Sequence, residues 1–176
     1  MAADDIIRLR PITIDDTDQI VAWRNQDFIR RNFIYQELFT REGHLSWLHN
    51  QVETGHVVQF IICLTDGREI GSVYLRDIDR EKGTAEYGIF IGEKDALGCG
   101  YGMAAAKEML AYGFEKLYLN KIYLRFLSDN ISAAKSYEHA GFCMTERTET
   151  VTTLLRGERK VCFMEIDRSK WEEINR

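Results

Sequence analysis

The most informative segment of this sequence is residues 84–117, TAEYGIFIGEKDALGCGYGMAAAKEMLAYGFEKL. A β-rich run at 84–91 leads to the glycine-rich stretch GCGYG at 98–102, and apolar residues then recur every three or four positions to about Leu117. Alternate glycines directly before a helix with no proline or acid in its first turn let several backbone N–H groups point at one anion. The segment therefore predicts a strand, an anion-binding loop and a helix, with a diphosphate as the natural ligand.

Two common nucleotide-binding motifs do not fit this spacing. The dinucleotide fingerprint is GxGxxG in the first βα turn, followed about twenty residues later by an acid that ends the next strand. Here the pattern is GxGxG, a hairpin precedes it, and the next strand at 121–127 carries no acid. The P-loop is excluded because the sequence has no Gly-Lys-Ser/Thr. A diphosphate bound without these features suggests a carrier such as coenzyme A. The alternative is a glycine turn used only for close strand–helix packing.

Composition and charge describe one domain, residues 1–176, in which 45% of the residues are hydrophobic. The net charge of −5 disfavours a general phosphate-backbone binder, so we expect no nucleic acid partner. The longest apolar stretches are strand-length, which predicts no membrane association. Residues 1–5 lack the basic-then-apolar order of a secretory signal, which predicts a cytoplasmic location. No CxxC pair and no i,i+4 histidine pair is present, so no metal site is expected.

The rest of the chain alternates strand and helix patterns. Thr13 and Thr40 are placed as helix caps, and Thr65-Asp66-Gly67 joins two β-rich runs into a hairpin. We expect strands at 6–10, 57–64, 69–78, 84–91, 121–127, 142–153 and 160–166, and helices after Thr13, at 28–33, at 41–52, up to 117 and at 132–139. The predicted fold class is α+β, with one mixed, mostly antiparallel central sheet and helices on both faces.

Two motifs give the chain a family resemblance. Residues 91–102, IGEKDALGCGYG, resemble the acetyl-CoA-binding segment of the GNAT superfamily of N-acetyltransferases, whose core is usually Q/R-x-G-x-G/A. Residues 130–142, NISAAKSYEHAGF, are similar to the family's N-x-x-A-x-x-x-Y-x-x-x-G-F, at the expected distance downstream. The resemblance covers nearly all of residues 6–166 and implies a GNAT-like sheet, acetyl-CoA as co-substrate and no metal. Family members are often dimers, so it also implies a homodimer.

The resemblance also implies where acetyl-CoA binds. It assigns the glycine loop to the diphosphate and the strand ending at Phe90 and Ile91 to the pantetheine arm, with the splayed strand end at the thioester carbonyl. The implied cofactor-binding residues are Phe90, Ile91, Leu97, Gly98, Cys99, Gly100, Tyr101, Gly102 and Asn130. Leu97 stands where the family often has Gln, Arg or an aromatic residue, and Cys99 where a basic residue is common. The loss of that cation predicts weaker binding of CoA.

Transfer of an acyl group to an amine needs a proton acceptor and a proton donor. An alkyl amine with a pKa of about 10.4 is protonated at pH 7, and removing that proton costs about 4–5 kcal/mol. The leaving thiolate can take a proton from a neutral tyrosine hydroxyl, and the resemblance places Tyr137 in that role. Glu86, in the strand expected to flank the thioester, is the candidate on the base side, and His44 is the second candidate. The alternatives are a packing role for Tyr137 and a solvent-facing position for Glu86.

The N-terminal third suggests where the acceptor binds. Its WRN…H-x-x-W pattern is similar to that of family members that acetylate amino groups on nucleotide-linked sugars, including those of bacterial surface-sugar pathways. The implied substrate-binding residues are Trp23, Arg24, Asn25, Arg30, His44 and Trp47. Arginine can bind a phosphate with two hydrogen bonds, and tryptophan can stack on a base or a sugar. The same residues occur in relatives that acetylate ribosomal-protein N-termini, and core tryptophans with solvated arginines are the alternative.

The preferred function is therefore acetyl-CoA-dependent N-acetylation of a primary amine on a small molecule, with an amino-sugar nucleotide as the acceptor. A spermidine-type polyamine is the main alternative acceptor, and a protein N-terminal α-amine is another. A polycation favours an acidic cleft with Glu37, Glu42 and Glu86 clustered, whereas a nucleotide diphosphate favours Arg24 or Arg30 pointing inward. An alternative of another class is a non-catalytic acyl-CoA-binding module, which would bind CoA without turnover.

Overall fold

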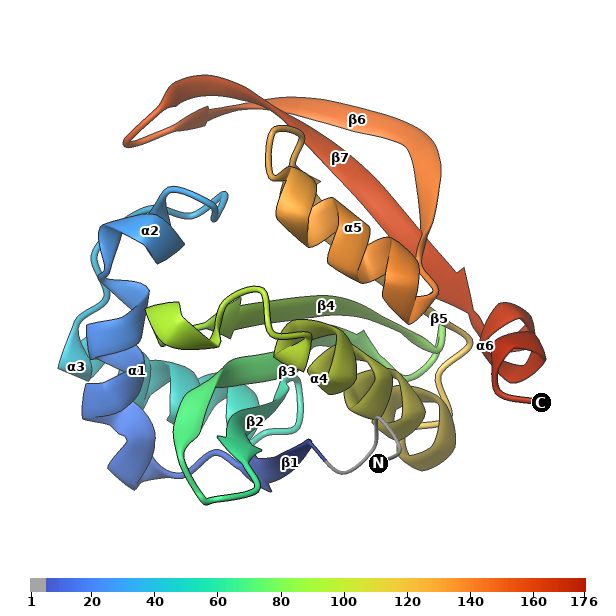
Figure 1. Ribbon diagram of the computed structural model, residues 1–176, viewed down its shortest axis with the longest axis horizontal. Helices are drawn as coiled ribbons and strands as arrows, with labels where there is room; N and C mark the ends of the chain where they lie inside the picture. Colours follow the sequence, from blue (N-terminus) through green and yellow to red (C-terminus); the bar gives the residue numbers. More distant parts are fainter. Residues whose placement is uncertain (1–5) are drawn as a thin grey trace.

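The structure of the protein is a computed structural model that describes residues 6–176 (Figure 1). The absence of a secretory signal was predicted from residues 1–5, which lie outside the described residues. The strands are β1 (Ile7–Pro11), β2 (Val58–Leu64), β3 (Glu69–Asp79), β4 (Thr84–Ile91), β5 (Lys121–Leu127), β6 (Cys143–Thr153) and β7 (Gly157–Asp167). The α-helices are α1 (Thr17–Arg24), α2 (Asp27–Arg30), α3 (Arg41–Trp47), α4 (Tyr101–Ala111), α5 (Ile131–Ala140) and α6 (Arg168–Ile174). Within residues 6–176, no helix has the length and apolar character needed to span a membrane.

These elements match the predicted order, with one addition. Thr40 caps α3 by accepting a 3.0 Å hydrogen bond from a backbone N–H, as predicted. Helices α3 and α4 each continue into a π-helical turn, which ends at Val52 and Lys116 respectively. The sequence analysis missed α6. The Asp167 side chain caps this helix, and Trp171 packs against the main core.

The seven strands form one sheet in the order β1-β2-β3-β4-β5-β7-β6. The predicted hairpin between β2 and β3 and the antiparallel pairing of β3 with β4 are confirmed. In the described part of the chain, only β4 and β5 pair in parallel. The α+β class with a mixed, mostly antiparallel sheet is therefore confirmed.

The parallel pair between β4 and β5 is short. It joins Thr84–Glu86 to Lys121–Tyr123, and beyond these residues β4 has no strand partner on that side within residues 6–176. Strand β4 continues beside β3 as far as Ile91, while β5 continues beside β7 as far as Leu127. The two strands therefore diverge, and β4 from Tyr87 onward offers backbone N–H and C=O groups along a free edge.

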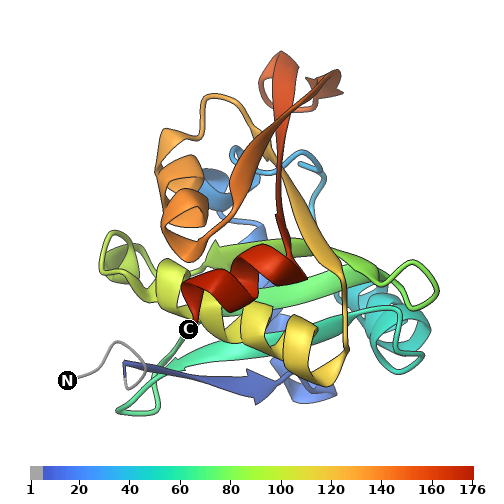
Figure 2. The same ribbon diagram turned by 90° about the vertical axis from the view of Figure 1, so that its right-hand side faces the viewer.

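The two faces of the sheet are covered differently (Figures 1 and 2). Helices α4 and α5 cover one face, which carries the main core. Fully buried side chains of that core include Leu75, Met109, Leu110, Phe114, Ile122 and Leu124. Burying each such side chain stabilises the fold by roughly 1.5–3 kcal/mol. Helix α1 covers the other face, where Ile20 and Trp23 pack against Phe90 of β4.

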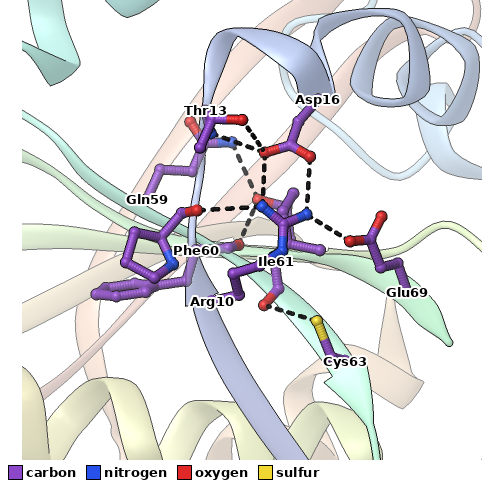
Figure 3. Close-up of polar contacts among 10 residues, drawn as sticks. Arg10, Thr13, Asp16, Gln59, Phe60, Ile61, Cys63 and Glu69 are labelled. Carbon is purple, nitrogen blue, oxygen red and sulfur yellow. Dashed lines mark hydrogen bonds and ion pairs between the residues drawn. The ribbon is translucent and has the colours of Figure 1, made fainter. Parts of the chain in front are cut away.

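The entry into α1 is fixed by an ion-pair cluster on β1 (Figure 3). The Arg10 guanidinium donates to both oxygens of Asp16, at 3.1 and 2.8 Å, and also to Glu69 at the start of β3. Asp16 also accepts a 2.7 Å hydrogen bond from the backbone N–H of Thr13. These contacts tie the turn before α1 to the sheet and so set where the helix crosses it.

The hairpin of β6 and β7 reaches over α5 towards α2 (Figure 1). Two hydrogen bonds join its turn to the segment after α2: the Leu155 N–H donates to Gln36 Oε1 at 2.8 Å, and Arg156 donates to the backbone carbonyl of Arg31 at 3.2 Å. Gln36 is only 2% exposed and also donates to the carbonyl of Phe33 at 3.0 Å. These hydrogen bonds hold the β6–β7 turn against the segment after α2.

Candidate active site

The gap between β4 and β5 gathers the groups predicted for acyl transfer. Tyr137 of α5 lies on one side of it, with its ring centroid 6.0 Å from that of Tyr87 on β4 and 6.0 Å from that of Phe126 on β5. One tyrosine ring therefore packs against both diverging strands. Burial raises the pKa of the Tyr137 hydroxyl, and Tyr74 of β3 adds to the rise. The hydroxyl stays protonated at neutral pH, which a general acid requires.

The glycine loop enters α4 as expected. Gly98 and Gly100 have φ angles of +73° and +84°, in the left-handed region that glycine adopts without strain. Gly100 directly precedes the 11-residue helix α4, whose first N–H groups have no acceptor within the helix. A side-chain methyl at either glycine would point into open space, so the backbone at these two positions is uncovered. These features fit a bound diphosphate.

The other predicted cofactor residues fall into two groups. Leu97 and Cys99 are exposed on the loop, and Tyr101 and Gly102 begin α4. Phe90 is buried, and its ring packs between Trp23 and Phe33, so only its backbone is available to a ligand. The backbone of Ile91 ends β4, while the Asn130 side chain caps α5 through a 3.3 Å hydrogen bond from the N–H of Ala133.

Glu86 is buried, not solvent-facing. It is 5% exposed and accepts hydrogen bonds from Arg125 at 2.9 Å and from Arg76 at 3.2 Å. The three residues lie on β3, β4 and β5, at the point where β4 and β5 begin to diverge. The solvent-face alternative is therefore wrong. These contacts favour an anchoring role for Glu86 over the proton relay expected from the sequence, because its oxygens are already shared by two guanidinium groups.

Most of the residues predicted to bind the acceptor have structural contacts instead. Trp23 is 2% exposed and donates to Glu93 at 2.8 Å, so its ring cannot stack on a ligand. Asn25 holds the backbone of Phe39 through two hydrogen bonds, at 2.9 and 2.7 Å. In the structure Trp23 and Asn25 therefore attach the N-terminal helices, and their substrate-binding roles stay predictions.

Arg30 and Trp47 are engaged in the same way. The Arg30 guanidinium donates twice to the carbonyl of Gln36, at 3.1 and 2.9 Å. Trp47 donates to Gln59 on β2 at 3.3 Å. These contacts give Arg30 and Trp47 structural partners, and the acceptor-binding roles expected for them stay predictions.

Arg24 is the exception among these residues. It is 5% exposed, and its Nη1 atom has no hydrogen-bond partner within the described part of the chain. Its guanidinium lies 3.6 Å from the centre of the Phe33 ring and 4.5 Å from that of Phe39. Burial lowers the pKa of Arg24 to about 10, so the group remains a cation at neutral pH. Arg24 is therefore a buried positive charge held by aromatic rings and not by a carboxylate.

His44 is buried under α1 and is not at the gap. Its Nδ1 atom lies 3.1 Å from Thr17 Oγ1 of α1, and its Nε2 atom has no partner in residues 6–176. Burial lowers the pKa of His44 to about 4, although Asp16 acts in the opposite direction. His44 of α3 therefore packs against α1, and the base and acceptor-binding roles expected for it stay predictions.

Comparisons with known proteins agree with this geometry. Residues 7–143 match the family described as acetyltransferase (GNAT) domain. The chain belongs to the GNAT acetyltransferase family. It is therefore an acyltransferase of the N-acetyltransferase type, as the two sequence motifs predicted.

Two curated relatives of this GNAT protein differ in how much of their length it covers. An uncharacterised protein of Methanocaldococcus jannaschii is 30% identical over 82% of this chain, but the chain spans only 29% of that protein. Spermidine N(1)-acetyltransferase of Escherichia coli is 31% identical over 77% of this chain and 72% of its own length.

Solved structures confirm the GNAT fold. Spermidine N-acetyltransferase from Vibrio cholerae, solved with CoA and spermine, has a TM-score of 0.86 and 24% identity, covering 94% of this chain and 98% of its own.

Among the residues of the GNAT site, the sequence pattern did not single out Arg76 and Arg125. The signal that could have found these two arginines is the alternation of side chains along β3 and β5. It places both arginines on the same sheet face as Glu86.

Replacing Tyr137 with Phe tests its role as the acid. The variant keeps the ring against Tyr87 and Phe126 and removes only the hydroxyl, so the thiolate leaves unprotonated. We expect kcat to fall by about 10²–10⁴-fold, measured as thiol release with saturating acetyl-CoA and amine. Tyr112→Phe is the matched control, because Tyr112 packs on Phe60 away from the gap. A loss of less than about threefold in Tyr137→Phe, with chemistry rate-limiting, would contradict the assignment.

Because His44 is buried in its neutral form, we expect the stability of the fold to decrease in acid. Above pH 6.5, the pKa of this histidine in the unfolded chain, His44 is neutral in both the folded and the unfolded state. Below that pH the unfolded state takes up the proton first. The free energy of unfolding should therefore fall by about 3 kcal/mol as the pH drops from 6.5 to 4. We expect urea unfolding between pH 7 and 4.5 to show this slope in the wild type and in His49→Gln, an exposed control, but not in His44→Gln. An unchanged slope in His44→Gln would show that another group titrates.

Proposed function

We propose that this chain is an acetyl-CoA-dependent N-acetyltransferase that acts on the primary amine of a small molecule. The observation that carries the proposal is the β4–β5 gap, with an unpaired β4 edge on one wall and the Tyr137 ring across it. Family membership supports the reaction class. The gap supplies what that reaction needs: backbone groups for a thioester and a protonated hydroxyl for the leaving sulfur.

Acetyl-CoA fits the groups around the gap. The loop from Gly98 to Gly102 and the first turn of α4 would bind its diphosphate through backbone N–H groups. The free edge of β4 beyond Tyr87 would pair with its pantetheine arm. Each hydrogen bond to the diphosphate contributes about 1.5–3 kcal/mol, which outweighs the helix dipole term of about 0.3–1 kcal/mol. The absence of a basic side chain at Leu97 and Cys99 therefore weakens this site without removing it.

For the acceptor, we propose a spermidine-type polyamine as the first class to test. The support is the 31% identity to the Escherichia coli spermidine N(1)-acetyltransferase over 77% of this chain. The acidic cleft expected for a polycation has a weak counterpart here. Glu86 is already shared by Arg76 and Arg125, and Glu37 and Glu42 are exposed on the N-terminal helical segment.

An amino-sugar nucleotide is the second candidate, and Arg24 is the observation that favours it. A buried guanidinium without a carboxylate partner favours an acceptor that brings an anion. A cavity of about 310 Å³ lies between α2 and the β6–β7 turn, lined by Phe28, Arg31, Asn32, Asp129 and Arg156. Within it Arg156 pairs with Asp129, while Phe28 offers an aromatic face. A phosphate and a base fit this chemistry better than a polycation does.

We also propose that the protein self-associates. The family resemblance implied a homodimer, and a Vibrio cholerae spermidine N-acetyltransferase with a TM-score of 0.79 and 22% identity has a dodecameric structure. The cytoplasmic location stays a prediction from the sequence.

An acetylation assay separates these functions. We expect thiol release from acetyl-CoA with spermidine, because of the relationship to spermidine acetyltransferases. The same assay should include an amino-sugar nucleotide, an unphosphorylated amino sugar as its matched control, and a peptide with a free N-terminus. Turnover with the amino-sugar nucleotide and none with spermidine would move the assignment to the second candidate. Turnover with the peptide alone would indicate a protein N-terminal acetyltransferase. CoA binding without turnover on any amine would contradict the proposed enzyme and favour the acyl-CoA-binding module.

A further inference from the structure

Tyr74 of β3 lies at the β4–β5 gap on the face of the sheet opposite Tyr137. Its cross-strand partner on β4 is Gly88, two residues beyond the last residue of β4 that pairs with β5. A side-chain methyl at Gly88 would collide with the Cζ and Oη atoms of Tyr74, so the phenol lies flat over the Gly88 backbone. Any residue larger than glycine at this position would block the phenol. The hydroxyl is therefore held over β4 where that strand has no β5 neighbour.

The Tyr74 hydroxyl has the properties of a ligand-binding group. The residue is only partly buried, and its hydroxyl makes no hydrogen bond within residues 6–176. Burial raises the pKa of this hydroxyl, while Arg24 and Arg76 act in the opposite direction. The hydroxyl is therefore neutral at pH 7, with a free O–H and free lone pairs.

The two tyrosines flank the same gap. Tyr74 shares its sheet face with Gly88 and Glu86, whereas the ring of Tyr137 packs on Tyr87 on the other face. Burial raises the pKa of the Tyr137 hydroxyl, and Tyr74 adds to that rise. A thioester bound along β4 would therefore meet Tyr137 on one side and Tyr74 on the other.

The charges around Tyr74 favour a neutral amine. The pKa of the Tyr74 hydroxyl is lowered by three guanidinium groups, those of Arg24, Arg76 and Arg125. It is raised by one buried carboxylate, that of Glu86. Asp77, an exposed carboxylate, lies 3.8 Å from Arg76. This excess of positive charge disfavours an ammonium ion beside the hydroxyl, and so helps to release the proton that an attacking amine must lose.

We propose that the Tyr74 hydroxyl accepts a hydrogen bond from the acceptor amine and directs the nitrogen lone pair at the thioester carbonyl. The inference deepens the proposed function and rests on it. In the reaction, the neutral amine nitrogen bonds to the carbonyl carbon, and the carbonyl electron pair moves to oxygen. The C–S bond then breaks, and the sulfur takes the proton of Tyr137. The proton released by the nitrogen passes to water and restores Tyr137, while Tyr74 stays neutral.

The test compares Tyr74→Phe with the wild type on the best acceptor of the assay above. The variant keeps the ring over Gly88, so we expect an unchanged melting temperature and a KM for acetyl-CoA within about twofold. We expect kcat/KM for the amine to fall at least about tenfold, because a hydrogen bond to the reacting nitrogen is lost. Tyr123→Phe is the matched control, since Tyr123 lies on the same sheet face but opposite Glu86, where β4 and β5 are still paired.

A second variant tests the geometry. Gly88→Ala displaces the phenol, so removing the hydroxyl in the Gly88→Ala background should change kcat/KM for the amine by less than about twofold. An equal loss in both backgrounds would overturn the assigned position of Tyr74. Tyr74→Phe with wild-type kcat/KM for the amine, or with its loss confined to KM for acetyl-CoA, would overturn the assigned role. A wild-type chain that turns over no amine would overturn the proposed function, and this inference with it.

Discussion

Three residue pairs, Thr84–Glu86 with Lys121–Tyr123, join the two halves of the sheet in parallel. On one side of this junction β4 is held by the β1–β4 meander, and on the other side β5 is held by β7. A short parallel junction between two antiparallel units lets the strands separate beyond it. The free edge of β4 depends on that separation, and so does the gap beside Tyr74 and Tyr137.

Different interactions keep the gap open on its two faces. On the face covered by α5, the Tyr137 ring packs against both Tyr87 and Phe126, so it fills space that paired strands would close. On the other face, Glu86 links Arg76 of β3 to Arg125 of β5 at the point where the strands part. The result is asymmetric: an apolar face with a hydroxyl for the leaving sulfur, and a charged face where an amine would approach.

Much of the fold was predictable because its signals are local. The turn at Thr65-Asp66-Gly67, the cap at Thr40 and the glycines at 98–102 each act over a few residues, and the structure has the elements they predict. The last helix was missed because its apolar anchor, Trp171, needs the distant core to pack against. Tyr137 was located through its motif, which fixes its place on α5.

The acceptor side was less predictable, because charge and burial there arise from contacts between distant segments. The sequence shows that three of the residues on this side are polar or aromatic, but not which partners they have. Folding brings Trp23 to Glu93, Asn25 to Phe39 and Arg30 to Gln36. Glu86 was expected on the base side, with a solvent-facing position as the alternative, and its burial depends on two arginines that β3 and β5 bring to it. The same sheet alternation placed Tyr74 over Gly88, a relation that depends on strand register.

A crystal structure of the protein with acetyl-CoA would show whether the thioester binds in the β4–β5 gap. We expect the thioester carbonyl to lie against the unpaired backbone of β4 beyond Tyr87, with the Tyr137 hydroxyl near the sulfur and the Tyr74 hydroxyl on the opposite side of the carbonyl carbon. An acetyl group lodged elsewhere, such as the cavity lined by Phe28 and Arg156, with nothing between β4 and β5, would contradict this expectation.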